Sequence, residues 1–428
     1  MKTSAYGQIV ERWDIQFLKN LCVPGGIQTG PFGSQLHQKD YLPVGTPIIT
    51  VEHLGENRIV HEDLPRISDE DKDRLSRYIM RKGDIIFSRV GSVDRRSLVR
   101  NQEDGWLFSG RCLRVRPDPK KVNPDFLSWF FGLEAFKDYI RRIAVGATMP
   151  SLNTEILSNV PIVVPPLHEQ RAIADVLGSL DDKIELNRRM NATLESMARA
   201  VFKAWFVENE EAKGWKVSSL GELFPGDKQC VLTGPFGSHL HAHDYRSEGT
   251  PLILVKHVMD GKIIEDNLPL VGDHKLPEMR RYQLKTGDIV FTRVGAVGRT
   301  AYIHPRYEGW LISGQTLRMR VSDTSKLNPR FLAQVYLEQS FIDMVEGFAL
   351  GTTRPSLNTS ILQSFKFVVP PIEIQGKFAE IVLSFDNKIQ SNTAENHTLA
   401  ALRDALLPRL MSGDVRVKDV GLIAGEKS

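Results

Sequence analysis

Two copies of one sequence pattern occupy most of the chain, and this internal repeat constrains the fold more than any other feature. Motifs of the first half recur in the same order in the second half, at an offset of 204 residues that becomes 205 after one inserted residue. The paired segments are TGPFGS at 29–34 and 233–238, GDIIFSRVGSV at 83–93 and GDIVFTRVGAV at 287–297, GATMPSLN at 146–153 and GTTRPSLN at 351–358, and VVPP at 163–166 and 368–371. Solenoid repeats have periods of roughly 20 to 50 residues. The much longer period here predicts that each copy is a complete domain plus an appended element.

Length and composition agree with a folded protein of at least two domains. The chain has 428 residues, of which 41% are hydrophobic and 25% charged, as in ordinary globular proteins. No apolar run approaches the roughly 20 residues that cross a bilayer, and residues 1–10 lack the apolar core of a signal peptide. We therefore expect a cytoplasmic protein without a membrane segment.

Cysteine content and net charge restrict the kinds of site that the chain can hold. Cys22, Cys112 and Cys230 form no CxxC pair, so neither a disulfide framework nor a thiolate zinc site is indicated, and all three are expected to be buried. The net charge is only +3, which does not by itself indicate a strong nucleic-acid binder. Any argument for DNA binding must therefore rest on local features.

Each copy is predicted to be a mixed domain closed by a helix. Residues 45–116 are rich in β-branched and aromatic side chains punctuated by Gly, Pro and Asp, which indicates short strands and turns. Residues 124–143 and 329–345 carry apolar side chains at helical spacing after a proline, which predicts one helix in each copy. The predicted fold class is α+β, a tandem duplication of a mixed α/β domain plus a long helix.

A heptad pattern follows the two proline pairs. The seam positions of the first copy are Ile173, Leu177, Leu180, Ile184, Asn187, Asn191, Leu194, Ala198 and Val201, and those of the second copy are Phe378, Val382, Phe385, Ile389, Asn392, Asn396, Leu399, Arg403, Leu406 and Leu410. A lone helix would expose this apolar stripe, so we expect the two helices to pair as an antiparallel coiled coil. The antiparallel register places Asn187 opposite Asn396 and Asn191 opposite Asn392, where buried asparagines can fix the alignment; the alternative is a solvated, frayed mid-helix.

The heptad segment also predicts a spacer. The span of 28 residue steps from 173 to 201 would separate two domains, expected at opposite ends of the helices, by about 40 Å at about 1.5 Å per residue. DNA half-sites one helical turn apart lie roughly 34–36 Å from each other. The predicted organisation is a globular domain at 1–160, a central helical spacer at 161–213, a second globular domain at 214–365 and a C-terminal helical spacer at 366–428; the family resemblance described next implies that both globular domains are target-recognition domains.

The ordered motifs resemble the DNA-specificity (S) subunit of type I restriction-modification enzymes. The resemblance rests on TGPFGS, GDIIFSRVGSV, GATMPSLN and the helix start VVPPLHEQRAIADVLGSLDDKIELN with its copy VVPPIEIQGKFAEIVLSFDNKIQSN, and it extends over nearly the whole chain. The second helix departs from the first at Gly376, where the first has Arg171, and at Arg403, which interrupts the seam. The second helix therefore departs from the pattern of the first at these two positions.

The resemblance implies a non-catalytic subunit in which each domain reads one half of a bipartite, asymmetric site in double-stranded DNA. It implies that the helices dock two copies of an adenine methyltransferase that uses S-adenosylmethionine, and that motor and nuclease (restriction) subunits can join the complex. The sequence itself holds no phosphate loop, no NPPF-like methyltransferase motif and no HExxH motif. A duplicated adaptor that binds protein, and a self-contained nuclease or methyltransferase, are the competing interpretations.

The TGPFGS loops are candidate phosphate contacts. Their glycines allow a tight turn and close backbone approach, and their serine hydroxyls suit phosphate, while pure turn architecture and a core role for the phenylalanines are the alternatives. The candidate DNA-binding residues here are Gly30, Phe32, Gly33 and Ser34 in the first copy, and Gly234, Phe236, Gly237 and Ser238 in the second.

Arginines and polar loop residues supply the other DNA candidates. Arg89 and Arg293 follow a predicted strand and can clamp guanine or hold phosphate, whereas the pairs Arg114 with Arg116 and Arg318 with Arg320 are weaker candidates. The loop residues suit base or phosphate contacts, with helix capping as the alternative for Ser and Asn. The remaining candidates are Thr148, Ser151, Asn153, Thr353, Arg354, Ser356, Asn358, Lys39, His53, His243, Lys256 and His257.

A histidine cluster in the second copy is the strongest signal for a metal. His239, His241, His243 and Asp244 have alternating spacing, but the first copy answers them with Gln35, His37, Lys39 and Asp40. A metal that the shared fold requires would be present in both copies, so we predict no metal site and interpret these residues as DNA contacts.

Overall fold

The computed structural model describes residues 1–31, 33, 35–146, 148–227, 229–235, 240–349 and 355–419. The chain divides into two compact units. The first unit comprises residues 1–187 and 394–428, and the second comprises residues 188–393. Each unit thus contains one globular domain together with parts of two long helices, α6 (Leu167–Phe202) and α12 (Ile372–Ser412). This division cuts across the helical spacers predicted from the sequence.

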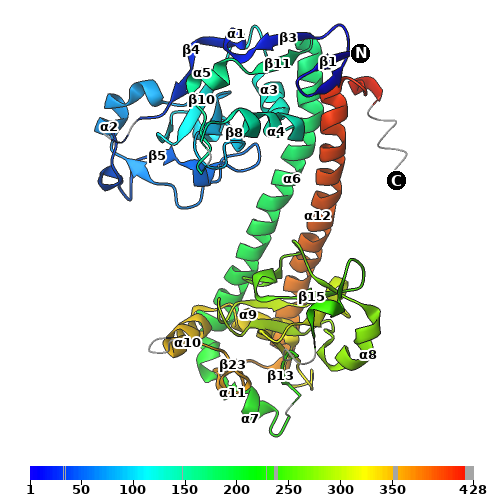
Figure 1. Cartoon of the computed structure of the whole chain (residues 1–428). Coiled ribbons are helices and arrows are strands. Elements are labelled where there is room, and N and C mark those ends of the chain that lie inside the picture. The colour runs from blue at the N-terminus through cyan, green and yellow to red at the C-terminus, as the bar shows by residue number, and fades with distance from the viewer. Residues whose placement is uncertain are drawn as a thin grey trace. The chain divides into compact units, whose positions relative to one another are not determined.

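The first unit is built on a four-stranded antiparallel sheet with strand order β4-β10-β7-β8 (blue to cyan in Figure 1). Its strands are β4 (Cys22–Thr29), β10 (Cys112–Pro117), β7 (Ile85–Ser88) and β8 (Arg96–Leu98). Smaller sheets are formed by β6 (Arg66–Ile67), β5 (Thr46–Ile49) and β9 (Leu107–Phe108), by β11 (Pro161–Val164) and β3 (Asp14–Phe17), and by β1 (Lys2–Ser4) and β2 (Gly7–Ile9). The strands and turns expected over residues 45–116 are confirmed.

The second unit repeats this plan with the order β13-β22-β19-β20. These strands are β13 (Val231–Thr233), β22 (Thr316–Met319), β19 (Ile289–Thr292) and β20 (Thr300–Tyr302). The remaining sheets contain β14 (Tyr245–Arg246), β18 (Leu270–Val271), β15 (Thr250–Ile253) and β21 (Leu311–Ile312), the pair β12 (Lys216–Ser219) and β23 (Lys366–Val369), and the pair β16 (Val258–Met259) and β17 (Lys262–Ile263). The duplicated α+β fold predicted from the repeat is confirmed.

Short helices surround the sheets. They are α1 (Leu18–Leu21), α2 (Asp69–Arg74), α3 (Pro124–Phe130), α4 (Glu134–Ile143) and α5 (Thr154–Ser158) in the first unit, and α7 (Leu220–Leu223), α8 (Leu276–Met279), α9 (Pro329–Val335), α10 (Gln339–Ala349) and α11 (Thr359–Ser364) in the second. Asn123 and Asn328 accept backbone N–H groups at the starts of α3 and α9, where proline occupies the first helical turn.

The prediction of one helix over 124–143, and of one helix over 329–345, is wrong in its number of helices. The first range contains α3 and α4, and the second contains α9 and most of α10. In the first unit the amide of Gly132 donates to the carbonyl of Trp129 at 2.8 Å, which tightens the chain after α3. A Cβ at Gly132 would lie 2.3 Å from Nη2 of Arg96. A side chain at this position would therefore have to displace the end of the buried Arg96 side chain. Apolar spacing alone does not reveal this interruption.

In each unit the parts of α6 and α12 run antiparallel. In the first unit, Nδ2 of Asn187 donates to Oδ1 of Asn396 at 2.9 Å, and in the second, Nδ2 of Asn392 donates to Oδ1 of Asn191 at 2.8 Å. These are the two pairs that the heptad alignment predicts. Asn187 and Asn392 are completely buried, so a hydrogen-bonded partner offsets the cost of removing them from water.

Arg403 interrupts the seam for a reason that the heptad pattern does not show. Its guanidinium lies 3.2 Å from a carboxylate oxygen of Asp181 and 6.0 Å above the ring of Trp129. Nε of Arg58 donates to the other oxygen of Asp181 at 2.7 Å. The heptad alignment places Leu180 opposite Arg403. In the structure, Arg403 belongs to an ion-pair network that joins both helices to the first domain.

The segment after β2 and the last turn of α12 meet in the core of the first unit. The amide of Val10 donates to the carbonyl of Ser412 at 3.1 Å, and buried Trp13 packs in the same cluster as Leu410 and Met411 of α12. Gly413 has φ +80°, and a Cβ there would lie 2.2 Å from the Val10 side chain. The three cysteines are buried, as expected. Within the described residues, no helix is both long and apolar enough to span a membrane.

Candidate nucleic-acid interface

Three repeated motifs converge at one end of the central sheet of the first unit. The amide of Gly30, just after β4, donates to the carbonyl of Cys112 at 3.1 Å. The carbonyl of Arg89, just after β7, accepts from the amide of Leu152 at 2.9 Å, and Gly91 donates to Pro150 at 2.9 Å. We call the resulting cluster the motif-loop surface; in the first unit it consists of residues 29–31, 89–91, 109–111 and 148–153.

The second unit forms the same surface from its own copy of the motifs. Gly234 donates to the carbonyl of Thr316 at 3.1 Å, and the carbonyl of Arg293 accepts from Leu357 at 2.9 Å. The surface here consists of residues 233–235, 293–295, 313–315 and 355–358. Distant segments of the chain thus meet in both units. The strands β10 and β22 lie between β4 or β13 on one side and β7 or β19, which end just before Arg89 and Arg293, on the other.

Glycine is required where the TGPFGS loop crosses the loop before β10. A Cβ at Gly30 would lie 2.1 Å from the carbonyl oxygen of Ser109, and one at Gly234 would lie 2.0 Å from that of Ser313. Both distances are far inside van der Waals contact. The glycines of the repeated motif therefore permit a close backbone crossing, as the sequence suggested.

The substitution Gly30→Ala is expected to displace this crossing at a strain of about 1–3 kcal/mol. Specific DNA binding by the full chain should weaken about tenfold, an amount that corresponds to roughly 1.4 kcal/mol. A titration with duplex DNA measures the effect. Gly178→Ala, in the part of α6 that belongs to the same unit and outside the motif-loop surface, is the control, because a Cβ at Gly178 meets nothing within 4 Å. Equal affinities of the two variants would contradict the crossing's role.

The structure exposes many of the candidate DNA-binding side chains. The exposed residues are Gly33, Lys39, Thr148, Asn153, His243, Lys256, Ser356 and Asn358, whereas Arg89, Ser151 and Arg293 are half-buried and Gly30 and Gly234 are buried. Nη1 of Arg89 donates to the carbonyl of Gly110 at 3.0 Å, so this side chain lies across the motif-loop surface. The candidates Phe32, Ser34, Phe236, Gly237, Ser238, Thr353 and Arg354 lie outside the described residues.

Several candidates already have structural partners. Asn153 and Asn358 accept the amides of Ile156 and Ile361 at 2.7 and 2.9 Å and so cap α5 and α11. Helix capping, the alternative to DNA contact, therefore accounts for the side-chain oxygen of each asparagine. Their exposure still leaves the NH₂ groups available to a ligand.

His53 and His257 occupy equivalent buried positions. Nδ1 of His53 accepts the amide of Thr50 at 3.0 Å, and Nδ1 of His257 accepts the amide of Leu254 at 3.1 Å. Burial is the main reason that the pKa of His257 lies below its ordinary value, and nearby Lys256 adds to this effect. Both rings are buried and accept a backbone amide of their own turn, so they stabilise that turn. Their role as DNA contacts stays a prediction.

The aspartate of the repeated GD motif has a role that sequence reasoning missed. Asp84 and Asp288 are 1% exposed, and each forms a two-point ion pair with an arginine of the RxR strand. The distances are 2.7 Å in both bonds of Asp84 to Arg116 and 2.6 Å in both bonds of Asp288 to Arg320. The sequence did carry a signal for this ion pair, because the aspartate and the arginine are 32 positions apart in both copies.

Each copy also anchors its long helix in the same way. Oε1 of Gln170 accepts the amide of Asn123 at 2.8 Å, and Oε1 of Gln375 accepts that of Asn328 at 2.8 Å. Both glutamines are completely buried. The repeated glutamine at the start of each helix therefore fixes the helix to its own domain.

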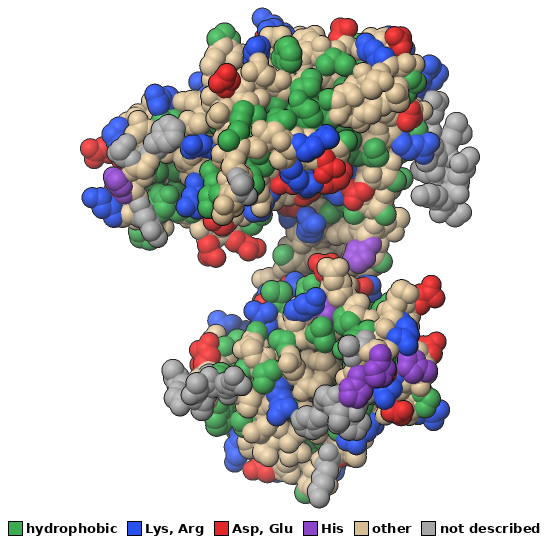
Figure 2. All heavy atoms as spheres, viewed as in Figure 1, with side chains coloured by type: hydrophobic (Ala, Val, Ile, Leu, Met, Phe, Trp, Pro, Cys, Tyr) green, Lys and Arg blue, Asp and Glu red, His purple; other side chains and the backbone are tan. Residues whose placement is uncertain are grey.

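The histidine cluster of the second unit surrounds a carboxylate. Asp244 accepts the amide of His241 at 2.7 Å and lies 3.6 and 3.5 Å from Nε2 of His243 and His274. Figure 2 shows histidines gathered beside Lys and Arg side chains on one face of this unit. Among the described residues, which exclude His239, no group of three or more His, Cys, Asp or Glu side chains has the geometry to hold a metal ion.

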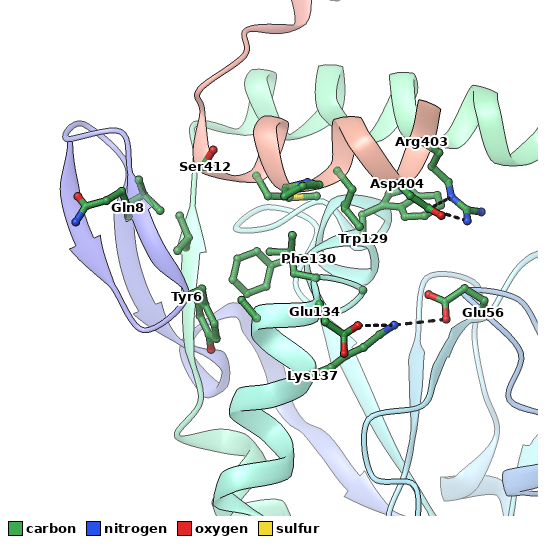
Figure 3. Close-up of a pocket in the computed structure, with 18 residues that line it drawn as sticks. Tyr6, Gln8, Glu56, Trp129, Phe130, Glu134, Lys137, Arg403, Asp404 and Ser412 are labelled. Atoms are coloured by element: carbon green, nitrogen blue, oxygen red, sulfur yellow. Dashed lines mark hydrogen bonds and ion pairs between the residues drawn. The ribbon is translucent and has the colours of Figure 1, made fainter. Parts of the chain in front are cut away.

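A cavity of about 520 Å³ in the first unit lies between the β1–β2 hairpin, the α3–α4 region and the last turns of α12 (Figure 3). Its floor is apolar and includes Trp129 and Phe130. The charges at its rim pair with one another, since Lys137 lies 3.7 Å from Glu134 and 3.8 Å from Glu56. The cavity therefore offers apolar packing space. Each charged side chain that Figure 3 labels pairs with another charge, so none of them is free for acid-base chemistry.

Two similar sheet domains that carry equivalent loop surfaces, each packed on paired heptad helices, define a two-domain recognition protein. A family model described as the type I restriction modification DNA specificity domain matches residues 17–196 and 212–401. Because these matches cover both copies and most of the length, the chain belongs to this family. The resemblance inferred from the motifs is confirmed.

Curated relatives are specificity subunits of type I restriction enzymes. The MjaIX specificity subunit of Methanocaldococcus jannaschii is 25% identical over 440 residues, covering 98% of this chain and 97% of the relative. The HindI specificity subunit of Haemophilus influenzae is 24% identical over 429 residues, covering 84% and 92%. The crystal structure of the type I S subunit from M. genitalium has a TM-score of 0.60 at 17% identity, covering 95% of this chain and 98% of that one, and supports the fold.

Proposed function

We propose that each unit reads one half of a bipartite, asymmetric site in double-stranded DNA through its motif-loop surface. The observation that carries the proposal is that three motifs distant in sequence converge in the same way in both units. The surfaces share their backbone plan but differ in side chains, such as the exposed Arg111 in the first unit against the exposed Gln315 in the second. A shared plan suits contacts to phosphate, which carry no sequence information, and differing side chains suit contacts to bases, which do.

The long helices offer an outer face to partner subunits. On α6, Leu186 and Met197 are 54% and 44% exposed, and both lie outside the heptad seam. We propose that this face docks methyltransferase subunits, two per chain because the plan is duplicated, and that restriction subunits can join. S-adenosylmethionine and the chemistry would belong to those partners, and the complex would act on cytoplasmic DNA.

The test is adenine methylation mapping at single-base resolution in cells that express this chain with its neighbouring methyltransferase. A split motif with a constant gap, lost when this chain is deleted, is expected. In parallel, binding of the purified complex to a duplex that carries the motif should fall steeply with salt, because phosphate contacts release counterions. The absence of any motif, together with salt-independent DNA affinity, would favour the protein-binding adaptor instead.

A further inference from the structure

A basic pocket lies in the second unit at the end of the central sheet away from the motif-loop surface. The strand β22 connects the two ends of the sheet. At its start, the carbonyl of Thr316 accepts the amide of Gly234 of the motif-loop surface. Just past its other end, the amide of Arg320 donates to the carbonyl of Cys230 at 2.8 Å. Cys230 precedes β13 and lines the pocket, which has a volume of about 440 Å³. This size lies within the range of ligand pockets, roughly 300–1,000 Å³.

Positive charge dominates the lining. The cationic side chains are Arg280, Arg281, Lys285, Arg318 and Arg320, and the carboxylates are Asp227 and Glu308. The carboxylates accept local hydrogen bonds, Asp227 from the amides of Gln229 and Cys230 at 2.8 and 3.1 Å and Glu308 from the hydroxyl of Thr286 at 2.8 Å. Since Arg320 pairs with Asp288, the other four cations give the pocket its excess of positive charge.

The buried side chain of Arg318 is a second observation, besides the charge of the lining, that favours an anionic ligand. It is 3% exposed, its Nη2 donates to the carbonyl of Gln229 at 3.0 Å, and its buried Nε has no acceptor among the described residues. Burial lowers the pKa of Arg318 below its ordinary value, and the neighbouring charge of Arg320 adds to the effect. A buried guanidinium with an unfilled donor is costly unless an acceptor completes it.

The equivalent arginine of the first unit, Arg114, also has a buried Nε without an acceptor among the described residues, but a neighbouring side chain supplies an acceptor to its Nη2. There Nη2 of Arg114 donates to Oε1 of Gln28 at 2.7 Å. At an offset of 204, the second copy has Leu232 in place of Gln28, and leucine has no acceptor. The arginine is therefore kept in both copies, but in the second the side-chain acceptor is missing and the pocket carries the extra cation Arg280, where the first copy has Ser76.

We propose that this pocket binds a phosphate group. Arginine presents planar, paired donors that match phosphate oxygens, and the exposed Arg280, Arg281 and Lys285 surround the opening while Arg318 donates from below. The group can be a diester of the DNA backbone, in which case the inference rests on the proposed function, or a phosphate of a small molecule. Both sources share one chemistry, and the experiment separates them.

The first measurement is calorimetric titration of the full-length chain with inorganic pyrophosphate at constant ionic strength. Wild type is expected to bind saturably, and a triple variant R280Q, R281Q and K285Q to bind at least about tenfold more weakly, since bonds to charged groups contribute about 1.5–3 kcal/mol each. The matched control is K213Q, K216Q and K326Q, which removes the same charge from exposed positions outside the pocket. Its affinity should stay within about twofold, because distant exposed charges are screened.

The substitution Leu232→Gln tests Arg318 without a change of charge. It installs the acceptor that the first unit already holds, so pyrophosphate binding should weaken while the domain stays folded. No saturable binding by wild type, equal weakening in both triple variants, or unchanged affinity of the Leu232→Gln variant would each overturn the proposal.

Competition identifies the source of the phosphate. If the pocket takes a DNA phosphate, pyrophosphate should compete with a duplex that carries the motif found by methylation mapping. The R280Q, R281Q and K285Q variant should then bind every duplex more weakly, without altered sequence preference. If it takes a small phosphorylated molecule, pyrophosphate and duplex should bind together. Because the pyrophosphate titration needs no DNA, failure of the pocket is distinguishable from failure of DNA recognition.

Discussion

Replacing Asp288 by alanine is expected to destabilise the second domain by about 3–5 kcal/mol, the range for removal of one partner of a buried ion pair. Asp288 is 1% exposed, accepts two bonds of 2.6 Å from Arg320 and also accepts the amide of Lys285 at 2.8 Å. Its loss would leave a cation and a turn amide without their acceptor. Because whole domains are stable by only about 5–15 kcal/mol, the effect is large.

Urea denaturation of the full chain, followed by limited proteolysis that reports on each unit, measures this effect. Glu248→Ala, at an exposed carboxylate of the same unit, is the control and should change stability by no more than about 0.5 kcal/mol. Adding Arg320→Leu to Asp288→Ala should recover part of the loss, because it removes the uncompensated cation. A stability equal to that of the Glu248→Ala variant would show that the ion pair contributes nothing measurable.

Insertion of one heptad into both long helices is expected to lengthen the gap of the recognised site by about three base pairs. Seven residues add about 10.5 Å at about 1.5 Å per residue, and DNA rises about 3.4 Å per base pair. The insertions belong after Asn187 and Thr393, where the chain passes between the units, and seven residues keep the seam in phase. Methylation mapping should show the same two halves separated by the longer gap.

A heptad inserted into α6 alone is the control for this experiment. It would prevent the pairs Asn187–Asn396 and Asn191–Asn392 from forming together, because one would be displaced by two turns. Methylation at a defined gap should then be lost. An unchanged gap after the paired insertion would contradict the spacer role of the helices.

Patterns that repeat along the chain were predicted correctly. The duplication and the heptad seam depend on spacings of three, four and about 204 residues, which follow directly from helix geometry and from internal comparison. The asparagine pairs follow from the same alignment. The likeness of the two motif sets also identified the family, which the match to residues 17–196 and 212–401 shows.

Side-chain partners across the sheet were not predictable in this way. The order β4-β10-β7-β8 is not the order of the chain, so the pairing of Asp84 with Arg116 depends on which strands become neighbours. The bond between the carbonyl of Arg89 and the amide of Leu152 likewise joins segments that lie far apart in the chain. His53 was a candidate DNA contact by residue type, and only the turn around Thr50 reveals that its ring accepts a backbone amide.

The sequence by itself determined the duplicated plan, the seam of the long helices and the positions of the motifs, because each is a periodic or repeated property of the chain. Only the tertiary structure decided that three motifs form one surface in each unit, that Arg403 binds Asp181, and that Leu232 leaves Arg318 without the acceptor that Gln28 supplies to Arg114. The physical reason is that burial and hydrogen bonding act between neighbours in space, and these neighbours are set by sheet order and packing.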